Sequence, residues 1–249
     1  MTPRPLSPSD GTWHGAPHAP RHVAVVIDAL RAADGHGGAE ALRQTVLGCR
    51  EHGVGWLSVL LPIAHNGNSA ACGGMLRDLR QFVRGEAAAL SRRGVRLAPY
   101  PDAHAHGRDY NGTGAAVRAF LRALRSSAGV RISAESLRVH FGVGCGGRGE
   151  LVAALQWLAR EAAAGRLQAA QITVGSLEAQ LSARVLPPVD LLIRTGGSRQ
   201  ISDFLLWQAA YAELLFVEAP WTEFGREQFD AALSDYARRQ RTFGALPVT

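Results

Sequence analysis

The sequence predicts an α/β fold, with a single domain built on a central, mostly parallel sheet flanked by helices. Short apolar runs alternate along the chain with longer stretches of helical periodicity, which is typical of successive strand and helix units. The runs alternate with helices, as expected for parallel strands covered on both faces. Connections between the predicted elements are mostly short, and no linker divides the chain.

Four apolar runs in the first part of the chain are predicted strands: His22–Asp28, Val54–Leu61, Val95–Tyr100 and Leu137–Val143. Helical patterns follow them, and a glycine ends each of the first three: Ala39–His52, Gly73–Arg93, Thr113–Ala128, Glu150–Ala164, a short helix from Gly175 and Ser176, and the tail Arg226–Arg241. Asp28 stands at the carboxyl end of the first strand. In open α/β sheets, that end is where ligands bind.

The charge composition excludes two classes of site. The net charge of +6 comes entirely from arginine, because the sequence contains no lysine. A Schiff-base lysine and a P-loop lysine are therefore both absent. An arginine-only basic surface suits phosphate ligands. The arginines are scattered and no aromatic-basic RNA motif occurs, so nucleic-acid binding is not expected.

The N-terminal residues and the cysteines indicate where in the cell the protein is expected. Residues 1–20 are rich in Pro, Ser, Gly and His and lack the apolar core of a secretory signal, so we expect a disordered arm before a domain spanning 21–249. No apolar run reaches membrane-spanning length, and no transmembrane segment is expected. Cys49, Cys72 and Cys145 are widely spaced without a CxxC motif, which favours a reduced, cytoplasmic protein.

The most informative stretch runs from Asp190 to Phe216 and is predicted to form strand, loop, helix and strand. Its loop carries Arg194, two glycines and Arg199, and Ser202 is a natural N-cap for the helix that follows, with Asp203 in the first turn. Outward-pointing backbone N–H groups, arginines and a hydroxyl at a helix N-terminus predict an anion site. The alternative from spacing alone is a surface turn with solvated arginines.

This stretch, DLLIRTGGSRQISDFLLWQAAYAELLF, resembles the C-terminal signature of the cis-prenyltransferases, the undecaprenyl diphosphate synthase family. The likeness continues through Trp221 to the closing arginine-rich segment before Gly244. Members of the family condense isopentenyl diphosphate onto an allylic diphosphate. The resemblance implies that Arg194 and Ser202 bind the isopentenyl diphosphate and that Glu213 helps to hold Mg²⁺. Gln200 replaces a family arginine, and Arg199 beside it is expected to compensate.

Asp28 aligns with the aspartate of the family motif Met-Asp-Gly-Asn-Gly-Arg-Trp. The chemistry requires such a group, because a diphosphate leaves well only when Mg²⁺ neutralises the developing charge, and Mg²⁺ prefers carboxylate and phosphate oxygens. The resemblance therefore implies a catalytic, metal-binding role for Asp28. The structural alternative is an aspartate that caps or turns the chain after a strand.

The half of the family site that holds the allylic diphosphate is rebuilt in this sequence. Ala29-Leu-Arg-Ala-Ala33 replaces the family's Gly-Asn-Gly-Arg-Trp, which leaves Arg31 and His36 as candidate substrate contacts. The family's Phe-Ser-x-Glu-Asn-Trp becomes Leu61-Pro-Ile-Ala-His-Asn-Gly67, where Asn66 persists as a catalytic candidate. Gly146-Gly-Arg148 matches the family's Gly-Gly-Arg loop, and Arg148 is predicted to bind substrate.

These residues imply an atypical enzyme of the family. With Mg²⁺ it would ionise an allylic prenyl diphosphate and transfer the prenyl group to a second prenyl diphosphate, in regular or branched coupling, or to another acceptor. A terpene synthase or cyclase acting on one prenyl diphosphate remains an alternative, because only one diphosphate half looks complete. A non-catalytic partner subunit is the other alternative. The resemblance also implies a homodimer, with Gly73–Arg93 as a natural interface helix.

Overall fold

Six parallel strands form one sheet in the order β3-β4-β2-β1-β5-β6 in the computed structural model of the chain. The structure describes residues 19–27, 37–61, 69–100, 114–127, 136–181 and 186–243. The strands are β1 (His22–Val26), β2 (Trp56–Leu61), β3 (Val95–Pro99), β4 (Leu137–Val143), β5 (Leu191–Arg194) and β6 (Glu213–Phe216). The predicted α/β fold with a parallel central sheet is confirmed.

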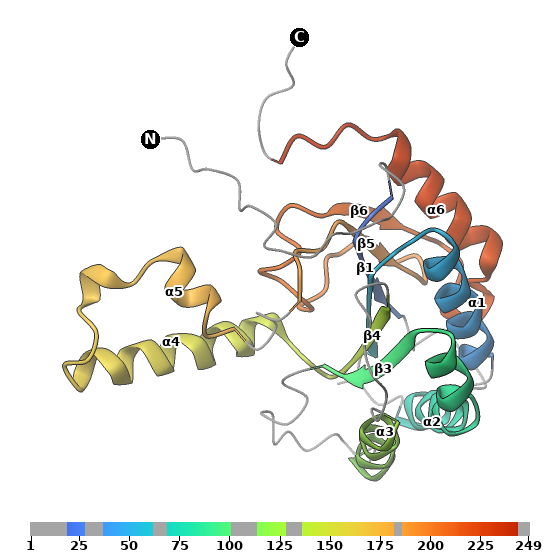
Figure 1. Ribbon diagram of the computed structural model, residues 1–249, viewed down its shortest axis with the longest axis horizontal. Coiled ribbons are helices and arrows are strands. Elements are labelled where there is room, and N and C mark those ends of the chain that lie inside the picture. The colour runs from blue at the N-terminus through green and yellow to red at the C-terminus, as the bar shows by residue number, and fades with distance from the viewer. Residues whose placement is uncertain are drawn as a thin grey trace.

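One face of the sheet is covered by four helices, which gather on the same side in Figure 1. They are α1 (Gly38–Glu51), α2 (Ser69–Arg92), α3 (Gly114–Ser126) and α6 (Arg226–Arg238). Alternate strand residues such as Val23, Val25 and Ile27 point into this layer and are fully buried. The other face is buried most completely on β1 and β5, whereas β3 and β4 carry Arg96, Arg138 and His140 on it.

The opposite face is covered mainly by the irregular residues on either side of β5, 186–190 and 195–212. Ala24, Val26, Leu60 and Leu192 point toward them and form a second, smaller core with Phe204 and other residues of these segments. Helix α4 (Gly147–Ala163) and the short helix α5 (Val174–Glu178) extend away from the body as a hairpin, with the 3₁₀ turn Ala169–Gln171 between them (Figure 1). The 3₁₀ turn Trp221–Glu223 leads into α6.

The helix predicted after Ser202 is a series of turns over residues 204–211. Two features explain the difference. The carbonyl of Asp203 accepts a hydrogen bond from the N–H of Gly147, so it is engaged outside its own segment. Leu205 has a φ of 50°, in the left-handed region that interrupts a right-handed helix.

The C-terminal helix also ends earlier than predicted, at Arg238 rather than at Arg241. Beyond it, Arg239 donates to the Glu213 carboxylate and Arg241 to the Asp190 carboxylate. These contacts draw the chain out of the helix and along the amino edge of β5 and β6.

The strand order places a topological switch between β1 and β5. From β1 the chain proceeds to β2 on one side, whereas β5 is followed by β6 on the other side. In parallel α/β sheets, the carboxyl ends of two such strands flank a crevice in which ligands bind. A ligand-binding site is therefore expected at the carboxyl edge of β1 and β5.

Candidate active site

Val26 of β1 and Arg194 of β5 are partners in the sheet register at this switch point. The N–H of Thr195 donates to the Val26 carbonyl at 3.2 Å, which continues the pairing to the end of both strands. Ile27 is the last described residue of this segment. Four predicted site residues, Asp28, Arg31, His36 and Asn66, lie outside the described residues.

Arg194 is the last residue of β5 and shares a sheet face with Leu192. Its side chain is partly buried, and its Nε is buried with no hydrogen-bond partner. Among the described residues, no carboxylate forms an ion pair with its guanidinium. A buried guanidinium donor without a partner is costly, and a bound anion would satisfy it. Arg194 therefore has the environment that a diphosphate-binding arginine requires.

The two glycines after Arg194 shape the loop but do not offer the expected anion donors. Gly196 and Gly197 have φ values of 85° and 75°, which favour glycine. Their N–H groups donate to the carbonyls of Ala219 and Val217, both at 2.9 Å. The prediction that backbone N–H groups here point outward is thus wrong for these two residues, because carbonyls of the segment after β6 accept their hydrogen bonds. An anion at this edge would depend on side chains.

Arg199 lies farther out on the same loop. Its side chain is 81% exposed, and its guanidinium is 3.5 Å from the equally solvent-facing carboxylate of Glu218. Such an exposed ion pair contributes little to stability. The substrate-binding role of Arg199 stays a prediction.

Ser202 and Arg148 are brought together by Asp203. The hydroxyl oxygen of Ser202 accepts a hydrogen bond from the N–H of Phe204 at 3.2 Å. Next to it, Asp203 Oδ1 accepts from the N–H of Arg148 at 2.8 Å. The side chain of Arg148 is exposed and forms no ion pair with any described residue. Two predicted substrate-binding residues thus adjoin each other at the N-terminus of α4.

Close packing explains the glycine pair before Arg148. A Cβ on Gly146 would lie 2.5 Å from Asp203 Oδ2, and a Cβ on Gly147 would lie 2.7 Å from Leu206 Cβ. Sequence reasoning placed Asp203 in the first turn of its own helix and missed its contact with α4. The Gly-Gly spacing was the available signal, because it indicates a close approach of another segment.

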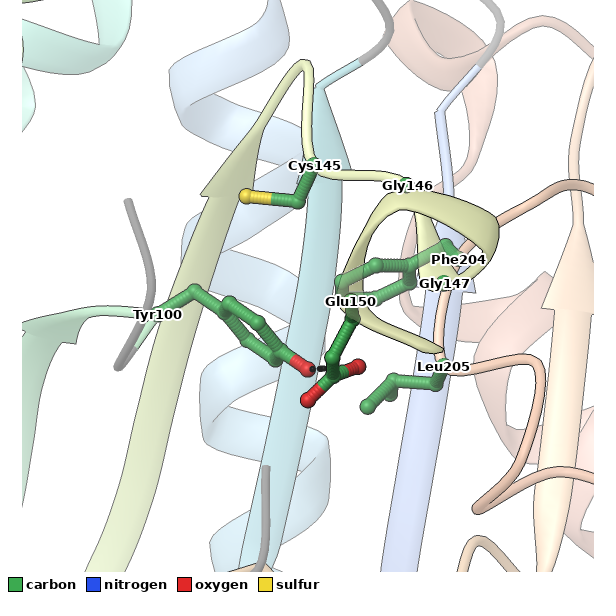
Figure 2. Close-up of a pocket in the computed structure, with 7 residues that line it drawn as sticks. All are labelled: Tyr100, Cys145, Gly146, Gly147, Glu150, Phe204 and Leu205. Carbon is green, nitrogen blue, oxygen red and sulfur yellow. Dashed lines mark hydrogen bonds between the residues drawn. The ribbon is translucent and has the colours of Figure 1, made fainter. Parts of the chain in front are cut away.

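A small cavity lies behind this contact, lined by Tyr100, Cys145, Gly146, Gly147, Glu150, Phe204 and Leu205 (Figure 2). The Glu150 carboxylate and the Tyr100 hydroxyl point toward each other, and the hydroxyl donates at 3.3 Å. Glu150 is only 5% exposed, which is unusual for a carboxylate. Sequence reasoning placed these two residues at the ends of a strand and a helix and did not assign either to a site. The position of Glu150 in the first turn of α4 favours negative charge through the helix dipole.

Glu213 lies elsewhere. It is the first residue of β6 and pairs with Leu191, whereas Arg194 pairs with Phe216 at the other end of the strand. Three strand positions span about 10 Å. The Glu213 carboxylate is bound by Arg239 at 3.0 Å. Within one chain, Glu213 is therefore not brought to the edge that carries Arg194, and its metal role stays a prediction.

Among the described residues, no group of three His, Cys, Asp or Glu side chains is arranged to hold a metal ion. No helix in that part of the chain is long and apolar enough to cross a membrane. A protein-only metal cage is thus not found in the described part. The arrangement is that of an anion site, with two arginines that lack carboxylate partners near one edge of the sheet.

Comparisons with known proteins point to one family. A family model described as "Putative undecaprenyl diphosphate synthase" matches residues 28–244. The isoprenyl transferase of Zymomonas mobilis is 35% identical over 245 residues, covering 93% of this chain and 94% of the relative. Isoprenyl transferase 2 of Bradyrhizobium diazoefficiens is 36% identical, covering 92% of this chain and 91% of the relative.

Solved structures share the fold. Lavandulyl diphosphate synthase from Lavandula x intermedia, solved with dimethylallyl diphosphate, superposes with a TM-score of 0.75 at 22% identity, covering 91% of this chain and 99% of that one. A probable undecaprenyl diphosphate synthase from Campylobacter jejuni gives a TM-score of 0.66 at 21% identity, covering 90% and 98%.

Proposed function

Because this chain belongs to the undecaprenyl diphosphate synthase family of cis-prenyltransferases, we propose that it is a prenyltransferase acting on prenyl diphosphates. The bond between an allylic prenyl group and its diphosphate breaks, the diphosphate leaves with the electron pair, and Mg²⁺ would assist this departure. A new carbon–carbon bond then forms to the alkene of a second prenyl diphosphate, in regular or branched coupling, or to another acceptor, and the cation that results from alkene attack loses a proton.

One observation carries this proposal: the register of Val26 with Arg194 at the switch point. Ile27 is the last described residue after β1, and Asp28 follows it in the sequence. In parallel α/β sheets, ligands bind at this carboxyl edge. In this proposal the Asp28 carboxylate and the Arg194 guanidinium, whose Nε is buried without a partner, serve the same diphosphate.

The arginines have separate tasks in this proposal. Arg194 donates to one diphosphate through a planar guanidinium that can bind two phosphate oxygens at once. Arg148 meets the same ligand from the N-terminus of α4, where Asp203 fixes its backbone. The Ser202 hydroxyl accepts from Phe204 and retains its own hydrogen for a phosphate oxygen. Holding two reactants in one geometry is most of what such a condensation requires.

Mg²⁺ fits the residues that are present. This ion is commonly held by one or two carboxylates together with substrate phosphates rather than by a complete protein cage. Asp28 is the carboxylate that would hold it, and Glu213 would need another arrangement to contribute. When bound, the ion would neutralise charge on the departing diphosphate.

We propose a homodimer that uses the α4–α5 hairpin. Large apolar side chains are exposed on it: Val152 by 52%, Leu155 by 53% and Val174 by 63%. The expected interface helix, α2, instead exposes charged residues such as Arg77, Arg84 and Arg92. A cytoplasmic location is part of the same proposal, and all three cysteines are described without a disulfide.

Product analysis tests the function. The purified protein is incubated with Mg²⁺ and allylic diphosphates of several lengths, with and without isopentenyl diphosphate, and products are identified by mass spectrometry. We expect acceptor-dependent coupling and diphosphate release, both abolished by Asp28→Ala. If the Asp28→Ala variant still releases diphosphate, Asp28 does not have the proposed catalytic role.

The same assay separates the alternatives. A cyclic product formed without any acceptor would identify a terpene synthase. If the pure protein has no activity but the mixture with a complete homologue is active, the chain is a non-catalytic partner subunit.

A further inference from the structure

A second basic cluster lies at the amino edge of the sheet, far from the carboxyl edge that carries Arg194. We define the amino-edge cluster as Arg21, Arg96, Arg138 and His140. Arg96 pairs with Arg138 in the sheet register, and Arg138 pairs with Trp56 of β2. Registered neighbours point to the same face. Here that face is the one not covered by α1, α2, α3 and α6.

Nothing in the described part of the chain neutralises this cluster. None of its three arginines forms a side-chain hydrogen bond or an ion pair with a described residue, and all are partly buried. Arg138 instead stacks on the Trp56 ring, with its Cζ 4.6 Å from the ring centroid. The nearby carboxylate of Asp190 already accepts hydrogen bonds from the Arg241 side chain and from the N–H groups of Arg21 and His22.

Two nitrogen atoms of the cluster are buried without a partner: Arg96 Nε and His140 Nδ1. In folded proteins nearly all such atoms are paired, and a bound water, ion or ligand would satisfy these two. They come from adjacent strands, since Arg96 lies on β3 and His140 on β4. Both can donate a hydrogen bond, the histidine when its hydrogen resides on Nδ1.

The arginines also repel one another. Burial, together with the charges of Arg96 and Arg21, lowers the pKa of the Arg138 guanidinium. Burial first, and then His22, Arg96 and Arg138, lowers the pKa of His140 to about 4. The folded chain thus holds like charges together on a half-buried surface, and a bound anion would reduce the repulsion among them.

We propose that the amino-edge cluster is a second anion site that binds a phosphate group. Arginine is the side chain suited to phosphate oxygens, and three arginines with two unpaired buried nitrogens match the charge and the acceptor capacity of that group. A carboxylate ligand would satisfy fewer of these donors. The site is separate from the proposed catalytic edge, because its three arginines lie before or near the start of their strands, whereas Arg194 ends β5.

Calorimetry with inorganic diphosphate tests the proposal. We expect the wild-type chain to show two classes of site, one of which is lost or weakened about tenfold or more in Arg138→Gln. The matched control is Arg84→Gln, which removes one charge from the exposed side of α2 and should retain both classes. Arg194→Gln should remove the other class. Identical titrations of Arg138→Gln and wild type would overturn the second site, whatever Arg194→Gln does.

Stability without ligand gives an independent readout. In phosphate-free buffer of low ionic strength, Arg96→Gln should unfold at the same temperature as wild type or higher, because the substitution relieves repulsion. Diphosphate should then raise the unfolding temperature of Arg96→Gln less than that of wild type. A clear loss of stability in the ligand-free Arg96→Gln variant would overturn the proposal, since it would show that a group of the chain already neutralises Arg96.

A lipid headgroup carries the same phosphate chemistry as a free ion, and co-sedimentation distinguishes the two sources. Binding to phosphatidylglycerol vesicles that Arg96→Gln and Arg138→Gln both abolish would assign the site to a membrane headgroup. Diphosphate binding without vesicle binding would assign it to a soluble phosphate.

Discussion

Asp203 caps the N-terminus of α4 across 55 residues of sequence: its Oδ1 accepts the backbone N–H of Arg148 at 2.8 Å. The contact holds two separate segments of the candidate site, the Gly-Gly-Arg loop and the stretch after Ser202, in one position. A carboxylate at this end of a helix also opposes the positive end of the dipole. The arginine side chain is thereby left exposed while its backbone is fixed.

Asp203→Ala should therefore weaken both the fold and diphosphate binding. Removing an N-capping side chain typically costs about 1 kcal/mol. Urea denaturation measures that loss, and calorimetry measures the binding. Asp203→Asn is the control, because it retains an acceptor oxygen and should recover most of the stability. Equal losses in both variants would show that charge, rather than the hydrogen bond, is what matters.

Arg194→Gln should abolish one class of diphosphate binding without lowering the unfolding temperature. The guanidinium is partly buried and has no ion-pair partner among the described residues. Its removal therefore breaks no ion pair with them. Arg194→Lys should bind about tenfold more weakly than wild type, because an ammonium cannot grip two phosphate oxygens in a plane. A large drop in unfolding temperature for Arg194→Gln would contradict this role.

Acidification should destabilise the chain through His22. Burial lowers the pKa of this histidine from 6.5 to about 4, and its ring contacts the Pro187 carbonyl and the Ser58 hydroxyl. Between these two pKa values the unfolded chain binds a proton that the folded chain does not. Stability is thus lost as the pH falls through this window, by about 2 kcal/mol between about pH 7.5 and about pH 5.

Urea denaturation at the two pH values checks this effect, with His22→Asn as the comparison. That variant should be less stable at neutral pH, yet it should lose less stability on acidification. An unchanged pH dependence would assign the effect to other groups, of which His140 is the first candidate.

Asp190→Ala should destabilise the amino edge strongly. One carboxylate serves three donors there: the N–H of Arg21 at 2.8 Å, the N–H of His22 at 3.0 Å and Arg241 Nη1 at 2.6 Å. Hydrogen bonds to a charged group contribute about 1.5–3 kcal/mol each, and the donors left behind are partly buried. The free energy of unfolding should fall by about 3 kcal/mol or more. Combining Asp190→Ala with Arg241→Ala should cost less than the sum of the two single changes.

The elements of this fold were predictable because their signals are local. The apolar run Leu137–Val143 is a strand with the predicted bounds, and a glycine follows α1 and α2 near the predicted ends. The contact of Asp203 with α4 was not predictable, since it depends on a loop 55 residues away. The same holds for Gly196 and Gly197, whose N–H groups are used by residues 217 and 219. Motif spacing identified Arg194, but only the sheet order placed it beside β1.

The central place of β1 has a consequence for biosynthesis. This strand leaves the ribosome early, yet the His22 ring contacts the carbonyl of Pro187, 165 residues later, and β5 follows directly after that. Until then one hydrogen-bonding edge of β1, which is apolar from Val23 to Val26, has no native neighbour, and such edges promote aggregation. Chains that terminate before residue 190 should thus aggregate more readily than the complete protein.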